Sequence, residues 1–212
     1  MKKNVITKLL LGAAIFISPA LVAQSNFTID ASQTLSTFQF VDSEANVDKS
    51  YSGNYSGAYN LGYRYIHEKG IIVRTGIGMR TGGATMVYDG INYNWSLQYA
   101  TFNLGGGYMY GDGLFKPYLT VAGYFGYLLK ANQTVNNEDF DIINIGEIQK
   151  IDYGVIGSLG TQITLSDEIS AYTEFSYLRG LGNLETNETG QKSSNISYML
   201  SLGMSFSINT SK

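Results

Sequence analysis

The chain has no cysteine, one histidine and only two prolines among its 212 residues. Without cysteine it has no disulfide, no thiolate nucleophile and no zinc finger, and one histidine excludes a multi-histidine metal site. Its 14 Lys and Arg against 17 Asp and Glu leave no basic excess for tracking a phosphate backbone. Nucleic acid is therefore excluded as a partner. What is abundant, 25 Gly, 17 Tyr and 10 Phe, favours strands over helices.

Residues 1–23 have the three parts of a secretory signal peptide. A basic start precedes an apolar run over Leu9–Ile17, which is too short for the roughly 20 residues that span a bilayer, and Leu21-Val22-Ala23 before Gln24 reads as the cleavage site. The alternative is an N-terminal membrane anchor. We predict a signal peptide over 1–23 and one exported domain over 24–212, with 11 basic residues against 17 acidic ones.

Apolar and polar residues alternate along most of the exported chain, which is typical of strands with two different faces. The pattern predicts eight strands. The fourth changes phase near Tyr99-Ala100, which indicates a bulge. The eight segments are 28–41, 55–65, 71–80, 91–110, 115–129, 152–163, 169–177 and 197–208.

The connections between these segments alternate in length. Strict alternation of long and short connections puts all long loops at one end of the sheet and all tight turns at the other. An even number of strands connected in this way can close into a barrel. We predict an all-β, eight-stranded, antiparallel up-and-down barrel. The long connections are Asp42–Asn54, Thr81–Asn92, Ala131–Lys150 and Gly180–Asn195, and the short ones are His67–Gly70, Gly111–Phe115 and Ser166–Glu168.

Alternation alone leaves open which face points outward. A soluble lipocalin-like barrel that binds an apolar ligand has its apolar face inside, whereas a membrane barrel has it outside. An eight-stranded barrel holds little more than its own side chains, and the aromatic set on the apolar face is too bulky for that space. We therefore predict a transmembrane β-barrel in a bacterial outer membrane. The aromatic set comprises Tyr59, Tyr63, Tyr93, Trp95, Tyr99, Phe125, Tyr127, Phe175, Tyr177, Tyr198 and Phe206.

Charged residues on the polar face then lie in the lumen. Arg64, Arg74 and Arg80 face Asp152 and Glu174 as an expected internal ion-pair network, because an unpaired buried charge is expensive. Such a network either lines a selective channel or plugs a closed barrel. The narrow bore of eight strands favours the plug.

No residues with the pattern of an enzyme site are present. The single histidine, His67, falls in a predicted periplasmic turn, far from the loop end where outer-leaflet chemistry would occur. Gly105–Gly107 are followed by no helix, so they predict tight packing rather than a phosphate site. We expect no enzyme activity, cofactor or metal.

The predicted long loops are acidic. Oxygen-rich clusters of this kind can hold calcium, but these lack the spacing of a calcium-binding loop, so solvated charge is the favoured interpretation. The loops are the expected place for an unknown protein partner or surface ligand. Their acids are Asp42, Glu44 and Asp48 in the first, and Glu138, Asp139, Asp141 and Glu147 in the third.

Two stretches show a family pattern. Trp95–Leu129 contains a strand, a short turn, the triplet Lys-Pro-Tyr and a glycine-aromatic strand, and Asp152–Leu184 has the form of a following hairpin. In this order and spacing the region 90–208 resembles the PorT-like outer-membrane β-barrel family. The resemblance implies the barrel fold and an outer-membrane location. A founding member of that family is linked to protein secretion, a role we do not transfer to this chain.

The function we expect is structural or interaction-based: binding, adhesion or envelope assembly through the surface loops of a monomer embedded in outer-membrane lipid. Two alternatives remain from the sequence. One is a narrow pore for small solutes, and the other is the soluble periplasmic ligand-binding barrel.

Overall fold

The computed structural model describes residues 24–44, 46–48, 50–143, 148–186 and 192–208. The predicted signal peptide, residues 1–23, lies outside the described residues. The part of the chain that is described contains no helix long and apolar enough to cross a membrane.

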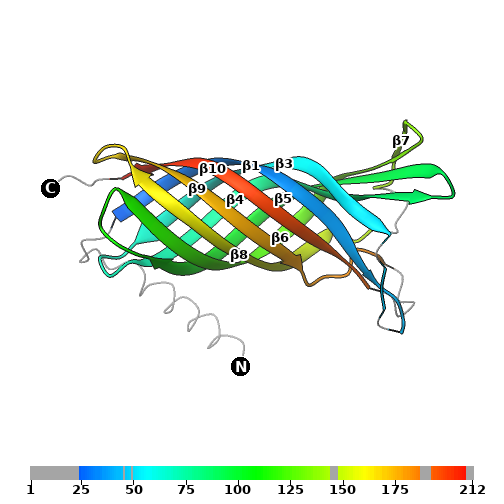
Figure 1. Cartoon of the computed structure of the whole chain (residues 1–212), viewed down its shortest axis with the longest axis horizontal. Helices are drawn as coiled ribbons and strands as arrows, with labels where there is room; N and C mark the ends of the chain where they lie inside the picture. Colours follow the sequence, from blue (N-terminus) through cyan, green and yellow to red (C-terminus); the bar gives the residue numbers. More distant parts are fainter. Residues whose placement is uncertain (1–23, 45, 49, 144–147, 187–191, 209–212) are drawn as a thin grey trace, which may run out of the picture.

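Eight long antiparallel strands form a closed ring, as predicted (Figure 1). Each strand pairs with its neighbour along the chain, and the last pairs with the first from Asn26↔Ser207 to Val41↔Lys192, so the ring has no free edge. The ring strands are β1 (Gln24–Val41), β3 (Tyr51–Ile66), β4 (Ile71–Tyr88), β5 (Ile91–Met109), β6 (Phe115–Val135), β8 (Ile151–Thr164), β9 (Ile169–Gly180) and β10 (Lys192–Ser207).

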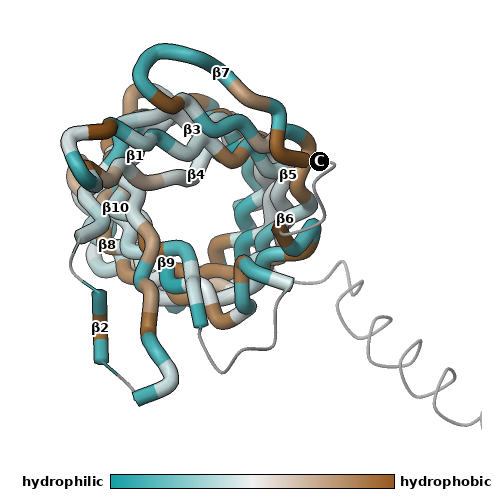
Figure 2. Tube along the Cα trace, turned by 90° about the vertical axis from the view of Figure 1, so that its right-hand side faces the viewer, coloured by the Kyte–Doolittle hydropathy of each residue, from teal (hydrophilic) through white to brown (hydrophobic). Residues whose placement is uncertain are grey.

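Two short strands lie outside the ring. β2 (Val47–Asp48) pairs with the end of β1, and β7 (Glu138–Asp141) pairs with the end of β6. Figure 2, which looks along the barrel, shows both beside the ring rather than in it. Both belong to loops at the same end, so the loops there carry structure of their own.

The outer wall is apolar and the inner wall is largely polar. Outward-facing Ile29, Leu61 and Leu202 are 50%, 54% and 68% exposed, whereas inward-facing Thr28 and Ser201 are each 6% exposed. This arrangement is the inverse of a lipocalin and matches a barrel whose outer face contacts lipid. Most of the predicted outward rings are exposed, as expected: Tyr59, Tyr63, Phe125, Tyr127, Phe175, Tyr177, Tyr198 and Phe206.

The outward assignment was wrong for Tyr93, Trp95 and Tyr99. β5 keeps one phase along its length, so Trp95, Leu97 and Tyr99 share the inner face, and Tyr99 is fully buried. Tyr93 is on the same side and stacks on Trp95 at 5.9 Å. The predicted irregularity does occur at this level, but its extra residue is on β6: Gln98 pairs with Lys130 and Tyr99 with Leu128. The bulge therefore shifts the phase of β6 and leaves that of β5 intact.

Two predicted long loops are instead extended hairpins. β4 and β5 continue through most of 81–92 and meet at Asp89-Gly90, where both residues have positive φ (50° and 75°). β6 and β7 likewise meet at Asn136-Asn137, with φ of 48° and 71°. Two residues of positive φ form the turn whose twist suits a hairpin, and Asp-Gly is among its preferred sequences.

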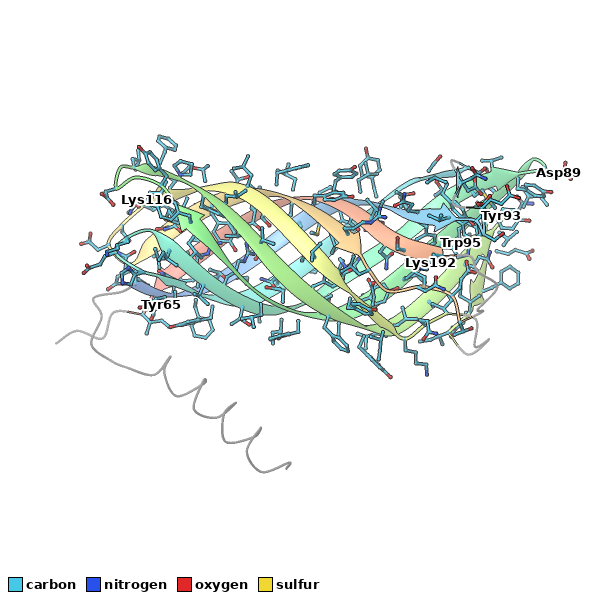
Figure 3. The ribbon with its side chains drawn as sticks, turned by 90° about the horizontal axis from the view of Figure 1, so that it is seen from below. Tyr65, Asp89, Tyr93, Trp95, Lys116 and Lys192 are labelled. Carbon is cyan, nitrogen blue, oxygen red and sulfur yellow. The ribbon has the colours of Figure 1, made fainter. Side chains whose placement is uncertain are left out.

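The two ends of the barrel differ. Tight turns lie at the end with Tyr65 and Lys116, while Asp89, Tyr93 and Trp95 mark the opposite end (Figure 3). Since strands of 12 to 21 residues exceed the 9–11 needed to cross a membrane, β4, β5 and β6 project well beyond it at the second end. We refer to this second end as the loop end.

Candidate functional site

Buried charges at mid-barrel form a first group, which we name the Glu174 cluster. Arg74 Nη1 donates to Glu174 Oε2 at 2.7 Å, and Arg64 Nη2 lies 4.0 Å from the same oxygen. The Tyr118 hydroxyl donates to that carboxylate at 2.9 Å. The Arg64 guanidinium lies over the rings of Tyr118 and Tyr172, at 4.7 and 4.8 Å. One carboxylate thus holds two arginines, and the second is supported by aromatic faces.

A second group, the Asp152 cluster, lies nearer the loop end. Arg80 Nη2 donates to Asp152 Oδ2 at 2.8 Å, and Tyr124 and Asn195 donate to the same oxygen at 3.1 and 2.8 Å. Arg80 also lies over the rings of Tyr99 and Tyr124, at 5.0 and 5.5 Å. Arg80 and Asp152 are 4% and 1% exposed. Burial this deep requires both charges to be paired.

The structure places all five of the charged residues selected from the sequence in the lumen, in two separate groups rather than one network. Sequence reasoning did not identify the tyrosines that complete each group. Tyr118 and Tyr124 lie on the inward face of β6, and Tyr172 lies on the inward face of β9. Their position on the same strand face as the charges could have identified them. A ring next to an arginine stabilises the pair by about 0.5–2 kcal/mol.

Very little open space separates the two clusters. The cavity between them has a volume of about 80 Å³, and its lining includes Asp30, Arg74, Arg80 and Glu174. Asp30 accepts hydrogen bonds from Asn60 and from the Tyr172 hydroxyl at 3.1 and 2.9 Å. A space of this size holds a few water molecules.

Apolar clusters lie in the lumen on both sides of these charges. Toward the tight turns, Ile66, Ile72 and Met109 pack with Tyr118. Toward the loop end, a second layer has a buried centre onto which further apolar residues pack. That layer consists of Leu97, Tyr99, Leu128, Ala131 and Ile142, with Phe38, Trp95, Ile143 and Ile148 against it.

A hollow of about 320 Å³ opens above the loop-end layer, and we name it the mouth pocket. Four rings line it, those of Phe38, Phe40, Tyr51 and Trp95. They come from β1, β3 and β5, at inward positions where these strands rise past the membrane belt. The sequence reading missed this pocket because it placed Trp95 on the lipid side.

A larger hollow of about 940 Å³ lies on the outer wall. Ile29, Leu61 and Phe102 line it, and all three point outward. Its place on the apolar wall makes it a surface against hydrocarbon chains, so we do not count it as a ligand site.

The remaining predicted sites lie in turns and loops. His67 is in the β3–β4 tight turn, where its Nδ1 accepts from the Lys69 amide at 3.1 Å. The Asp42 carboxylate accepts from the backbone amides of Asn46 and Glu44 at 2.8 and 2.9 Å, and these bonds, above all that from Asn46, lower the pKa of Asp42. Within the described ranges no three acidic or histidine side chains are placed to hold a metal. Glu147 lies outside the described residues.

Solved structures include barrels similar to this one. Neisserial surface protein A (NspA) is 13% identical, the match covers 87% of this chain and 97% of that one, and the TM-score is 0.55. Ail of Yersinia pestis, in complex with the heparin analogue sucrose octasulfate, is 14% identical; the match covers 87% of this chain and 99% of Ail, and the TM-score is 0.45. The Escherichia coli outer membrane protease OmpT is 11% identical; the match covers 87% of this chain and 97% of OmpT, and the TM-score is 0.40. No family model and no curated protein matches the chain.

The chain folds as an eight-stranded outer-membrane β-barrel. The closed ring, the apolar outer wall and the likeness to NspA agree on this fold. At 13% identity the likeness concerns the fold alone, so the function is inferred from the geometry of the lumen and of the loop end.

Proposed function

We propose that this protein is a sealed, integral barrel of the bacterial outer membrane that acts by binding at its loop end. Membrane lipid surrounds its apolar wall, and its surface loops and mouth pocket meet the external ligand or partner. The exported form begins after the predicted signal peptide, residues 1–23.

The observation that carries this proposal is the layered filling of the lumen. From the tight turns upward, an apolar layer, the Glu174 cluster, the Asp152 cluster and a second apolar layer follow one another. Arg64, Tyr99 and Asp152 are each 2% exposed or less. A conducting path would have to break paired, buried charges, each costly to separate. The interior therefore supports a plug, and the mouth is left as the accessible site.

The chemistry of the loop end supports binding rather than catalysis. His67 is at the opposite end of the barrel, and the buried charges below the mouth, Arg80 and Asp152, are already paired with each other. We infer that the protein is not an enzyme. We also infer a monomer, because every strand of the ring is paired within the chain.

Membership of the PorT-like family is part of the proposal. It is supported by the order of motifs in Trp95–Leu129 and Asp152–Leu184, which form two consecutive turn-linked strand pairs, β5–β6 and β8–β9. The family resemblance adds no specific ligand.

Current through planar lipid bilayers tests the sealed lumen. Reconstituted protein is expected to leave the bilayer silent at applied voltages where open porins give steps. Steady single-channel steps would instead favour the narrow-pore alternative. An open porin reconstituted in the same bilayers is the positive control.

A further inference from the structure

The mouth pocket has the composition of a site for an organic cation. Phe38, Tyr51 and Trp95 lie with their ring centroids 5.9 to 6.3 Å apart, and their planes are inclined to one another by 54° to 61°. The rings are therefore tilted rather than stacked flat. Phe40 extends this group, 6.3 Å from Tyr51. Grouped ring faces carry negative potential and attract cations.

One carboxylate also lines the pocket. Glu185 forms an isolated bridge with Ile148, which fixes its backbone at the rim, and its side chain forms no ion pair with any described residue. Among the described lining residues there is no Lys or Arg. Lys192, labelled near Trp95 in Figure 3, is exposed, on the face of β10 opposite to that of Ser193. The charge of the pocket is thus negative and uncompensated within its described lining.

A buried hydroxyl marks a polar contact inside the same pocket. Ser193 lines the pocket and is 5% exposed, and its Oγ has no hydrogen-bond partner among the described residues. Buried polar groups are normally paired. A ligand with a hydroxyl or carbonyl beside its apolar part would pair this atom.

The floor of the pocket separates it from the lumenal charges. Leu97 lines the pocket, and Leu97, Tyr99 and Leu128 pack together beneath it. A ligand in the pocket therefore does not reach Arg80, the nearest buried cation, which is already held by Asp152. The negative charge of Asp152 offsets the repulsion that Arg80 alone would exert on a bound cation.

We propose that the mouth pocket binds a small monovalent organic cation with an apolar body, of the quaternary or alkylated ammonium class. The rings of Phe38, Tyr51 and Trp95 contact its alkyl groups, Glu185 balances its charge, and Ser193 meets a polar substituent. A volume of about 320 Å³ is at the small end of ligand pockets and suits one such molecule. This inference rests on the proposed binding role and names its ligand class.

The pair choline and 3,3-dimethylbutan-1-ol tests the proposal, because the two have nearly the same shape and differ in charge. Trp95 is the only tryptophan of the chain, so its emission reports directly on the pocket. The full barrel is titrated in an uncharged maltoside detergent, which carries no choline-like headgroup. Choline is expected to change the emission saturably and to bind about five- to thirty-fold more tightly than the neutral alcohol.

Four variants separate the parts of the site. Glu185→Gln is expected to weaken choline binding about five-fold and to leave the alcohol unchanged, whereas Glu138→Gln, the same change on the exposed β7 hairpin, leaves both unchanged. Tyr51→Leu is expected to reduce the preference for the cation, because one ring face is lost while Glu185 remains, and Tyr51→Phe, which keeps the ring, is expected to retain it. Heat-shifted gel mobility verifies that each variant is folded.

Equal affinity for the two compounds, or no saturable response to either, would overturn the organic-cation site. Either result leaves the bilayer-current test untouched, so a silent barrel that ignores choline refutes this inference while the sealed-lumen proposal stands. A barrel that conducts and also binds choline would refute the sealed lumen and leave the organic-cation site standing.

Discussion

Arg74 on β4 and Glu174 on β9 form an ion pair of 2.7 Å between strands that lie opposite each other in the ring of eight. The contact joins residues 100 positions apart along the chain. Together with Arg80 and Asp152, it ties walls of the barrel that share no backbone hydrogen bonds. The lumen therefore contributes tertiary contacts that the strand ladder alone does not provide.

The two ion pairs should differ in how well they tolerate loss of one partner. Asp152→Asn leaves Arg80 buried with no carboxylate, and the expected loss is about 3–5 kcal/mol in the free energy of unfolding. Arg74→Ala should destabilise the barrel by less, because Arg64 remains 4.0 Å from Glu174. Urea unfolding in lipid vesicles measures both, with Asp112→Asn in the exposed β5–β6 turn as a near-neutral control. An unchanged midpoint for Asp152→Asn would contradict the lumenal plug.

The glycines of β5 permit a close approach to β6. A Cβ on Gly107 would collide with the Leu119 carbonyl oxygen and with Thr120, which are backbone and inward-facing groups of the neighbouring strand. Gly107→Ala is therefore expected to lower the free energy of unfolding by about 1–3 kcal/mol. Gly157→Ala is the matched control, because a Cβ there meets no atom within 4 Å. Equal stability of the two variants would show that the strands have room to separate.

Trp95 should be shielded from lipid. Acyl chains brominated near the headgroup quench tryptophans that touch lipid, and the inward place of Trp95 predicts weak quenching. The control moves the reporter to the outer wall: Tyr127→Trp in a Trp95→Phe background, where residue 127 is 48% exposed. Quenching of Trp95 as strong as that of the control would show that this ring contacts lipid and therefore does not line the mouth pocket.

The first loop should lose its local order in acid. Hydrogen bonds, chiefly from the Asn46 amide, hold the pKa of Asp42 below its ordinary value of 3.8. The stabilisation is therefore complete above pH 3.8 and is lost as the pH falls through the lowered pKa. Amide chemical shifts of Glu44 and Asn46 between pH 2 and 6 follow the loss. Asp42→Asn should abolish that pH dependence, and its persistence in the variant would assign the titration to another group.

The sequence predicted the ring of strands and the lipid-facing wall because both depend on a repeated two-residue period and on the volume of a narrow lumen. For the same reason it placed five charged residues on the polar face, but it did not select Asp30, which lies in the lumen beside Tyr172. It failed at the loop end. There β5 carries Trp95, Leu97 and Tyr99 on its inner face, so apolarity no longer marks the outside. The extra residue of the bulge is on β6, and the sequence of β5 alone does not show which residues of β6 pair with it.

Two further features depended on backbone geometry rather than on composition. Asp89-Gly90 and Asn136-Asn137 convert predicted loops into hairpins through positive φ at paired positions. The mouth pocket arises only when β1, β3 and β5 meet in space, since Phe38, Tyr51 and Trp95 are far apart along the chain. Neither feature is visible in a hydrophobicity pattern.

The central claim, a closed barrel embedded in the outer membrane, is tested most directly by gel mobility of the protein in isolated outer membranes, with and without boiling. A closed β-barrel resists unfolding in dodecyl sulfate at room temperature, so the account predicts a band that appears in the detergent-extracted membrane fraction and migrates faster before boiling than after it. A band in the soluble periplasmic fraction, with the same mobility before and after boiling, would contradict the account.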